Sequence, residues 1–522
     1  MMRQTTFFSP DPQDSSPQYL EDLATGYWYS DMLFAAVELD IFTVIGEDGK
    51  LLDELAESLD MGGEGLSRFL HALTTIGLVV KHGDRYCNTS IANQYLVSGK
   101  QEYFGGSILW RKELSQNWKT LIPSLKSGGR IGYGPGSGKE VEDPAVRMNR
   151  ITRYTDAMAC CARVKAREMM PFFEGLDISG DLLDIGSGSG ALASVFLDRF
   201  PLLKACLVDL PEVLGISKER MQEEGLAARM SFVAANVLEA WPLGETRYDI
   251  IMLSNIVHAF SEAELPHLIT QAAAYLKQDG LLIIHDFFLD HFSSKAALFD
   301  LNMFINTYNG RVFRSSVVEE KLAEAGLIHT GLLPLKTDTA VIISTRNPDM
   351  LLRLRQDSTQ LLMSRLLQMG FSDCRLISAE QINVSEWPEL KCKFGCGYYG
   401  SPHCPPHAPQ PEHTRKVLAG YRTALIIQGE PPTQDFQRKV LQAEREAFLL
   451  GFHRALAYWA GPCTLCKTCS ADKDCCNRKD ARPSMEGAGI DVYKTVRAAG
   501  LSLRTLDDKT DFVKYFGLLL IE

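Results

Sequence analysis

A short segment with glycine at every second position most constrains the fold of this chain. Residues 182–190 read Leu-Leu-Asp-Ile-Gly-Ser-Gly-Ser-Gly, an apolar run that leads directly into a turn with three glycines. Glycine has no side chain, so the backbone can turn tightly there and approach a ligand closely. The segment therefore predicts a buried strand, a ligand-binding turn and a helix that begins after the turn.

The region around this segment alternates short apolar runs with amphipathic stretches of helix length. We predict strands at residues 181–185, 205–208, 230–233, 250–253, 281–284 and 339–343. Strands that alternate with helices are typical of a doubly wound, Rossmann-like α/β sheet. The glycine turn follows the first of these strands.

An acidic residue follows the second strand. Asp209 lies about 20 residues beyond the glycine turn, where a carboxylate can accept hydrogen bonds from the two hydroxyls of a ribose. The order Asp-x-Gly-x-Gly-x-Gly differs from the Gly-x-Gly-x-x-Gly of pyrophosphate binders, and no phosphate-loop Gly-Lys-Ser/Thr follows. The two features predict a nucleoside site and disfavour dinucleotides and ATP.

The N-terminal part, residues 16–110, has the pattern of a helical domain with a wing. Apolar residues recur at helical spacing in Tyr27–Leu39, Leu51–Leu59 and Leu66–Leu78, and a hairpin pattern follows that ends at Asn88. This order is typical of a winged helix. Its third helix carries little positive charge, so we do not expect the domain to bind DNA.

The length of the chain, 522 residues, requires several domains, and the content of hydrophobic (45%) and charged (23%) residues is that of ordinary globular protein. We place connecting helices at residues 111–175, the glycine-turn domain at 176–345 and a cysteine-rich α+β domain at 357–522. A polar segment, Ser344–Met350, is interpreted as a linker. In the last domain we expect a helix over Gln434–Tyr458 and strands at 423–428 and 517–521.

Charge and hydropathy argue against two classes of partner, nucleic acid and membranes. A formal net charge of −11 disfavours a broad electrostatic grip on nucleic acid. The most apolar stretches are far shorter than the roughly 20 residues that span a bilayer. The first residues also lack the charged-then-apolar layout of a secretory signal. We therefore expect a cytoplasmic protein that binds neither nucleic acid nor membranes.

From about Tyr19 to Thr345 the chain resembles the class I S-adenosylmethionine (SAM)-dependent O-methyltransferases that carry an N-terminal dimerisation domain. The resemblance implies a homodimer and a glycine turn that holds the methionine end of SAM, with Asp209 at the ribose. The adenine would lie near Asn236, where the family usually has an acid. The cofactor residues implied are Asp184, Gly186, Gly188, Gly190, Asp209, Asn236, Val237 and Ser254.

His258 matches the position of that family's general base. Methyl transfer from a sulfonium mainly needs alignment, but deprotonation makes a phenol a better nucleophile, and the pKa of histidine suits this step. The alternative is a structural histidine at a helix start. The family's orienting acid is replaced by Val312 or Phe313, so we expect a base without a carboxylate. We interpret His285 and Asp286 as a polar strand end.

Eight of the 13 cysteines lie between Cys392 and Cys476, and in a reducing compartment such clustering indicates metal binding. Three of them have the Cys-x2-Cys-x2-Cys spacing that holds an iron–sulfur cube in bacterial ferredoxins: Cys463, Cys466 and Cys469. Zinc is the alternative, although its usual pattern is two separated pairs. A second group lies in a loop rich in Gly, Pro and His: Cys392, Cys396 and Cys404.

The cysteine region resembles a predicted metal-binding family of unknown function, found mainly in anaerobic bacteria and archaea. The matching pieces are Cys-x3-Cys-Gly-Tyr-Tyr-Gly, Cys-Pro-Pro and Gly-Pro-Cys-x-Leu-Cys-x2-Cys. The resemblance implies that Cys476 is the fourth ligand beside Cys463, Cys466 and Cys469. It implies a metal centre but no reaction.

Two functions are compatible with these patterns. The first is methylation of an oxygen on a hydrophobic small molecule, phenolic or tetrapyrrole-like, by a protein that also carries a [4Fe–4S] cluster or zinc. The second is a SAM- or ligand-binding redox sensor or interaction protein that transfers no methyl group. The intact glycine turn and Asp209 favour the enzyme.

Overall fold

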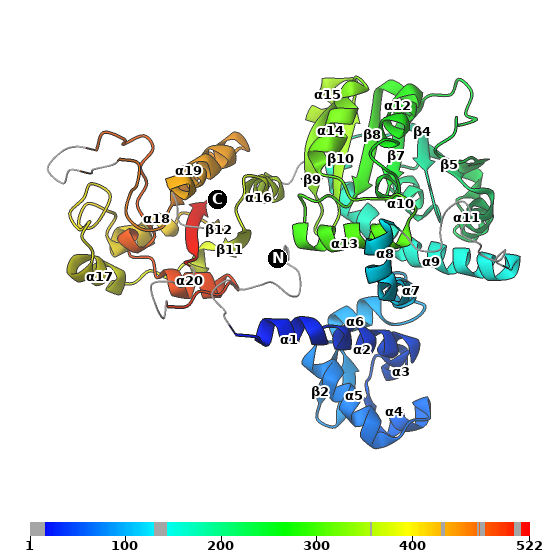
Figure 1. Cartoon of the computed structure of the whole chain (residues 1–522), viewed down its shortest axis with the longest axis horizontal. Helices are drawn as coiled ribbons and strands as arrows, with labels where there is room; N and C mark the ends of the chain where they lie inside the picture. Colours follow the sequence, from blue (N-terminus) through cyan, green and yellow to red (C-terminus); the bar gives the residue numbers. More distant parts are fainter. Residues whose placement is uncertain are drawn as a thin grey trace. The chain divides into compact units, whose positions relative to one another are not determined.

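The protein consists of two compact units, Leu20–Arg355 and a C-terminal unit that begins at Gln356. A computed structural model describes residues 16–129, 143–354, 358–429, 434–466, 469, 475–505 and 513–522. Figure 1 shows the helices and strands of each unit.

The N-terminal part of the first unit is helical and ends in a small hairpin. The three helices expected from the sequence are present, and each ends within a few residues of its expected bounds. β2 and β3 form the expected hairpin, and β1 extends it to a three-stranded antiparallel sheet. The elements are α2 (Tyr27–Glu38), α3 (Ile41–Ile45), β1 (Lys50–Leu51), α4 (Leu52–Leu59), α5 (Gly63–Thr75), β2 (Val79–His82), β3 (Arg85–Asn88) and α6 (Ser90–Tyr95).

A long helix joins this part to the central sheet. α9 (Pro144–Met169) packs against α7 (Gly105–Ser115) and against α10 (Ala191–Arg199). Its start is well defined, because the Asp143 side chain accepts a hydrogen bond from the backbone N–H of Ala145 at 2.7 Å and Pro144 fits the first turn. Between these helices lie η1 (Gln116–Thr120) and α8 (Leu121–Ser127), and η2 (Met170–Phe173) follows α9.

The central sheet has seven strands in the order β6-β5-β4-β7-β8-β10-β9, and β6, β5, β4, β7 and β8 run parallel. The first strand of the sheet, β4, is central, and the strand order reverses between β4 and β7. Helices α12 and α14 share one buried core with the strands. The strands are β4 (Gly180–Ile185), β5 (Leu203–Asp209), β6 (Met230–Ala234), β7 (Tyr248–Ser254), β8 (Leu276–Asp286), β9 (Ile328–Pro334) and β10 (Ala340–Thr345). The helices that follow β5, β7 and β8 are α11 (Pro211–Glu223), α12 (Leu265–Tyr275), α13 (Ser293–Asn306) and α14 (Ser315–Glu324).

All six strands predicted for this sheet are confirmed, whereas β9 was not predicted. The sequence Ile-His-Thr-Gly-Leu-Leu-Pro is buried only in its second half, contains glycine and ends in proline. Glycine and proline are typical of loops, so the sequence pattern indicates no strand here. An edge strand tolerates both residues because one of its sides has no strand partner. This segment forms a strand because it pairs with β10.

The linker predicted at Ser344–Met350 is wrong. β10 runs to Thr345, and Pro348–Leu352 form the short helix α15. Asn347 caps this helix, because its side-chain oxygen accepts a hydrogen bond from the backbone N–H of Asp349 at 3.1 Å. Asparagine and proline therefore begin a helix here.

The C-terminal unit is built on a four-stranded antiparallel sheet, β11-β12-β14-β13. Residues of α16 and α19 join one buried cluster with the sheet, and residues of α18 and α20 join another. The elements are α16 (Ser358–Gln368), β11 (Asp373–Ser378), α17 (Trp387–Gly395), α18 (Pro411–Leu418), β12 (Thr423–Gly429), α19 (Gln434–Leu449), β13 (Leu456–Tyr458), α20 (Val492–Ala498) and β14 (Tyr515–Leu520).

The helix predicted over Gln434–Tyr458 is too long. α19 ends at Leu449, and Gly451 follows with φ +96°, a conformation that glycine adopts without strain. The last three residues of the predicted helix instead form β13 and pair with β14. The two predicted strands of this unit are confirmed as β12 and β14.

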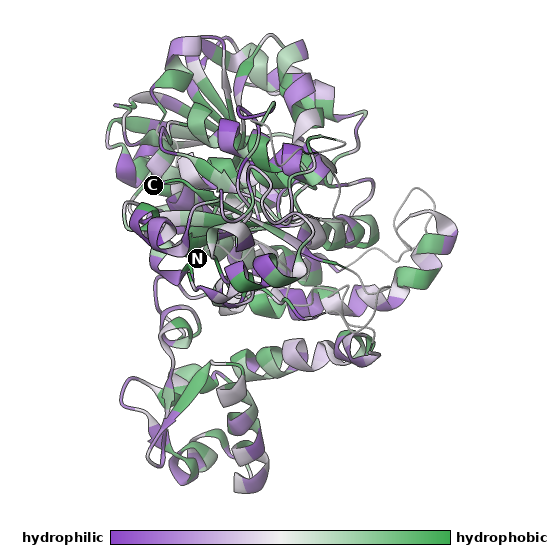
Figure 2. Ribbon diagram, turned by 90° about the vertical axis from the view of Figure 1, so that its left-hand side faces the viewer, coloured by the Kyte–Doolittle hydropathy of each residue, from purple (hydrophilic) through white to green (hydrophobic). Residues whose placement is uncertain are grey.

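The helices of both units are amphipathic. Figure 2 shows green, hydrophobic segments and purple, hydrophilic segments alternating along them. Within the described part of the chain, no helix is long and apolar enough to cross a membrane.

Replacement of Phe196 by alanine tests the packing of α10. Phe196 is fully buried and its ring meets that of Phe173 edge-on, with centroids 5.4 Å apart. We expect Phe196→Ala to destabilise the first unit by about 3–5 kcal/mol, because it removes a buried aromatic ring and leaves a cavity. Thermal unfolding measures the effect. Leu202→Ala, at a residue that is 75% exposed, is the control, and an equal shift in both variants would contradict the prediction.

Candidate functional site

The glycine turn lies at the carboxyl end of β4, beside the point where the strand order reverses. Gly186, Gly188 and Gly190 have φ values of +66°, +54° and +77°. A Cβ on Gly186 would lie 2.1 Å from Cδ1 of Ile256, so a side chain has no room there. A crevice for a ligand is expected at this place in an open parallel sheet.

Asp209 lies next to this turn, at the end of β5. Its Oδ2 accepts a hydrogen bond from the backbone N–H of Gly188 at 2.8 Å, and its Oδ1 accepts one from Leu210 at 2.7 Å. Burial raises the pKa of Asp209, and these two backbone hydrogen bonds oppose the rise. Each carboxylate oxygen can accept a second hydrogen bond, so the group can still bind two ribose hydroxyls.

Asp184 lies at the base of the turn and is 2% exposed. Burial and the negative charge of Asp209 raise its pKa to about 7. Within the described residues, three buried oxygens at this edge have no hydrogen-bond partner: Asp184 Oδ2, Ser187 Oγ and Asn255 Oδ1. Buried acceptors need donors. The ammonium group and hydroxyls of SAM are such donors, so the residues present fit this cofactor.

The other predicted cofactor residues lie at the same edge of the sheet. Asn236 forms the turn after β6: its Oδ1 accepts a hydrogen bond from the N–H of Leu238, and its Nδ2 donates one to Glu239, both at 3.1 Å. Val237 packs against the core. Ser254 ends β7, and its Oγ is 2.8 Å from Nδ1 of His285. Asn236 and Ser254 therefore both have protein partners.

His258 is held by a carboxylate. Its Nδ1 is 2.5 Å from Oδ1 of Asp286, and its backbone N–H donates to Oδ2 of the same residue at 3.1 Å. Asp286 is 1% exposed and ends β8. The expectation of a base without an orienting carboxylate is thus wrong, and Asp286 is more than a polar strand end. The parallel neighbours β7 and β8 end together, a signal that could have placed Asp286 near His258.

His285 has a structural role beside this pair. It is fully buried, and burial lowers its pKa to about 3, so the ring is neutral. Its Nε2 lies 2.9 Å from Oγ1 of Thr339, while Nδ1 faces Ser254. The neutral ring thereby links the ends of β7 and β8 to the residue before β10.

A cavity of about 790 Å³ opens beside His258. Helices α7, α9 and α13 line it together with the carboxyl ends of β7 and β8. Phe287 and Phe299 stack with ring centroids 3.8 Å apart, and the imidazole of His258 meets Phe299 edge-on at 5.1 Å. This volume lies within the range of small-molecule sites, and the stacked rings suit a flat aromatic ligand. The sequence patterns did not indicate this lining, because it comes from segments far apart in the chain.

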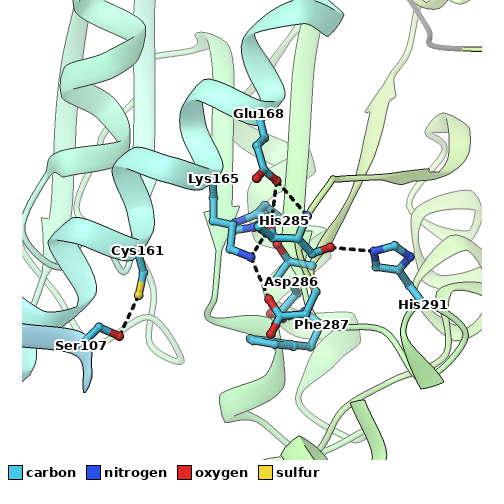
Figure 3. A network of polar contacts seen from close by, with 11 residues as sticks. Ser107, Cys161, Lys165, Glu168, His285, Asp286, Phe287 and His291 are labelled. Carbon is cyan, nitrogen blue, oxygen red and sulfur yellow. Dashed lines mark hydrogen bonds and ion pairs between the residues drawn. The ribbon is translucent and has the colours of Figure 1, made fainter. Parts of the chain in front are cut away.

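A polar network fixes α9 against the loop before β10, whose residues line the cavity (Figure 3). Lys165 Nζ is 2.8 Å from Oδ1 of Asp338. Glu168 Oε2 accepts a hydrogen bond from Oγ1 of Thr337 at 2.7 Å, and His291 Nε2 lies 3.2 Å from the carbonyl oxygen of the same threonine. α9 is therefore tied to residues 337–338.

The predicted metal ligands gather in two parts of the C-terminal unit, one at the end of α17 and in the loop after it, the other in the loop after β13. Cys466 and Cys476 have sulfurs 3.6 Å apart, and Asn477 Nδ2 donates to Cys466 Sγ at 2.9 Å. Burial raises the pKa of Cys404 to about 11, and the thiolates of both predicted groups add to the rise, namely Cys396, Cys392, Cys463 and Cys469. The two groups thus approach each other.

No three His, Cys, Asp or Glu side chains among the described residues are arranged to hold a metal ion. Residues 467–468 and 470–474, which lie between the predicted ligands, are outside the described part. The set of soft thiolate donors itself fits iron–sulfur or zinc.

Three family models match separate parts of the chain. Residues 21–98 match the O-methyltransferase dimerisation domain and residues 136–327 the O-methyltransferase domain. Residues 375–521 match DUF2284, described as a predicted metal-binding protein.

Individual relatives match somewhat more than half of the chain. The 3-hydroxy-5-methyl-1-naphthoate 3-O-methyltransferase of Streptomyces sahachiroi is 28% identical over 60% of this chain and 90% of its own length. The N,N-dimethyltransferase OxyT of Streptomyces rimosus is 28% identical over 55% of this chain and 82% of its own. Among solved structures, a putative O-methyltransferase from Nostoc punctiforme is 25% identical, with a TM-score of 0.54 over 63% of this chain and 99% of its own.

Human N-acetylserotonin methyltransferase, solved in complex with SAM, shares the fold. It is 21% identical and has a TM-score of 0.55, covering 65% of this chain and all of its own. Residues 21–98 and 136–327 thus have the two domains of the SAM-dependent O-methyltransferases with an N-terminal dimerisation domain, and residues 375–521 add a DUF2284 predicted metal-binding domain.

Proposed function

We propose that this protein transfers the methyl group of SAM to a hydroxyl of a flat aromatic small molecule, with His258 as the general base. The observation that carries the proposal is the short contact between His258 and Asp286 at the wall of a cavity lined by aromatic rings. A structural histidine needs neither the cavity nor a buried carboxylate on one ring nitrogen.

In this proposal each ring nitrogen of His258 has its own role. The Nδ1–H group donates a hydrogen bond to the carboxylate of Asp286, which fixes the tautomer, and Nε2 has no partner among the described residues. Nε2 can therefore accept the proton of the acceptor's hydroxyl, and Asp286 stabilises the imidazolium that results. SAM supplies an electrophilic methyl group on a sulfonium. Phe287 and Phe299 hold the acceptor ring in line with it.

Phenols are the acceptors we favour over tetrapyrroles. The relatives include a hydroxynaphthoate O-methyltransferase and the tetracenomycin 8-O-methyl transferase TcmO of Streptomyces glaucescens, whose names point to polyketide-type secondary metabolites. OxyT, by contrast, is named as an N,N-dimethyltransferase. An amine is therefore the acceptor to test against a phenol.

The protein acts as a homodimer in this proposal. The dimerisation domain supports it. The first turn of α2 also exposes three consecutive aromatic residues, Tyr27, Trp28 and Tyr29. Large apolar side chains that gather on a surface commonly mark a protein interface.

His258→Gln and Asp286→Asn test the base. We expect His258→Gln to lower kcat on a phenol at least about 100-fold, because general-base catalysis contributes this much, and to leave SAM affinity unchanged. Asp286→Asn should lower kcat as well, since an amide can hold the wrong tautomer. Release of S-adenosylhomocysteine measures the rate, and His82→Gln on the exposed wing is the control. Wild-type kcat in His258→Gln would refute the assignment.

Asp209→Asn tests the cofactor site. Its carboxylate would bind the ribose, so we expect the Kd for SAM to rise at least about tenfold, the usual effect of losing a hydrogen bond to a charged group. Isothermal titration calorimetry measures the Kd. Asp198→Asn, on the exposed side of α10, keeps the same change of charge without the contact. Equal affinity in both variants would exclude Asp209 as the ribose ligand.

We also propose a [4Fe–4S] cluster in the C-terminal unit, bound by Cys463, Cys466, Cys469 and Cys476. Two supports are the ferredoxin-like spacing of the first three cysteines and the close sulfurs of Cys466 and Cys476. The second group, Cys392, Cys396 and Cys404, would bind a further metal. Zinc is the alternative occupant.

Anaerobic purification followed by iron, sulfide and zinc analysis tests the cluster. We expect iron and acid-labile sulfide in equal amounts, with visible charge-transfer absorption. Cys476→Ser should lose both, whereas Cys475→Ser should retain them because Cys475 is not among the proposed ligands. A colourless protein that contains zinc and no iron would overturn the proposal.

A further inference from the structure

The cavity beside His258 carries an excess of positive charge. Its described lining includes one carboxylate, that of Asp338. Four cationic side chains line the same space: Arg111, Arg150, Lys165 and Lys295. A cavity for a neutral phenol does not require this excess.

The two lysines of the lining, Lys165 and Lys295, both act on the carboxylate of Asp338. Lys165 forms an ion pair with Asp338, with 2.8 Å between Nζ and Oδ1. Burial would raise the pKa of Asp338, but the charges of Lys165 and Lys295 outweigh it, so this pKa is lowered. One carboxylate cannot neutralise two lysines, and Lys295 has no ion pair within the described residues.

Arg111 also has no carboxylate within ion-pair distance in the described part of the chain. Its guanidinium lies over the face of Phe299, with Cζ 6.0 Å from the ring centroid. Phe299 is the ring that stacks on Phe287 and that meets the imidazole of His258. The guanidinium and the proposed base therefore flank the same aromatic ring.

The charges of Arg111 and Lys165 also reach Cys161, which lies on the wall formed by α9. It lies one turn before Lys165 on α9 (Figure 3), and its Sγ is 3.1 Å from Oγ of Ser107. The pKa of Cys161 is lowered to about 6, most of all by a hydrogen bond with Cys160, and also by Ser107 and the charges of Arg111 and Lys165. Even with Cys161 ionised, Arg111, Lys165 and Lys295 outnumber the two anions.

We propose that the acceptor carries a carboxylate in addition to the hydroxyl that is methylated, and that Arg111 and Lys295 bind this carboxylate. The inference rests on the proposed function and adds a substrate class to it. Arginine suits the role because its planar fork pairs with both oxygens of a carboxylate. Arg111 and Lys295 are both exposed, so their side chains can turn to meet a ligand in the cavity that they line.

A matched pair of acceptors tests the subsite. 6-Hydroxy-2-naphthoic acid and 6-hydroxy-2-naphthamide share the hydroxyl and the rings and differ in charge. We expect wild-type kcat/KM to favour the acid at least about tenfold, mainly through KM, because a charge-assisted bidentate pair is stronger than a neutral hydrogen bond. Arg111→Gln should reduce this preference. Arg153→Gln, which removes an exposed arginine paired with Glu113, should keep it.

Equilibrium binding of the acid to the protein with S-adenosylhomocysteine gives a readout without turnover. We expect Arg111→Gln to weaken this binding and added salt to weaken it in the wild type. If wild type methylates acid and amide equally well, the carboxylate subsite is refuted while the methyltransferase proposal stands. If neither naphthol nor any amine releases S-adenosylhomocysteine, the proposed function fails and the inference with it.

Discussion

Three carboxylates lie at the carboxyl edge of the central sheet, two of them buried and Asp209 partly buried, and each needs hydrogen-bond donors there. Asp209 takes backbone N–H groups from the glycine turn and from Leu210. Asp286 takes the backbone N–H and the ring of His258. Asp184 keeps an oxygen without a partner among the described residues. A buried carboxylate that lacks hydrogen-bond donors costs free energy. We therefore expect a ligand with hydrogen-bond donors to bind at this edge.

The acceptor cavity depends on a different constraint, the attachment of α9 to the sheet. α9 and α7 come before the first strand of the central sheet, β4, and depend on tertiary contacts for their position. Lys165 and Glu168 supply them, because they bind residues 337 and 338 just before β10. Lys165 therefore both positions α9 and adds positive charge to the cavity.

The sequence predicted those parts of the site that depend on local order. The glycine turn and Asp209 each follow a strand directly, so their positions need only the strand pattern and the parallel order. The partnership of His258 with Asp286 depends on how β7 and β8 end beside each other, 28 residues apart in the chain. It could have been found from the parallel register, in which Ser254 lies opposite His285. The cavity lining could not, because no pattern within α7, α9 or α13 shows which strands they face.

The position of the cysteines limits what a metal can do for the C-terminal unit. Its sheet has a buried cluster on each face, built from apolar residues of β11, β12, β13 and β14 and of the helices around them. The predicted ligands lie outside these strands, at the end of α17 and in loops. The apolar core is therefore complete without the metal, whereas the two cysteine loops have little apolar packing of their own. A metal bound to each cysteine group would hold that loop together and would add little to the core.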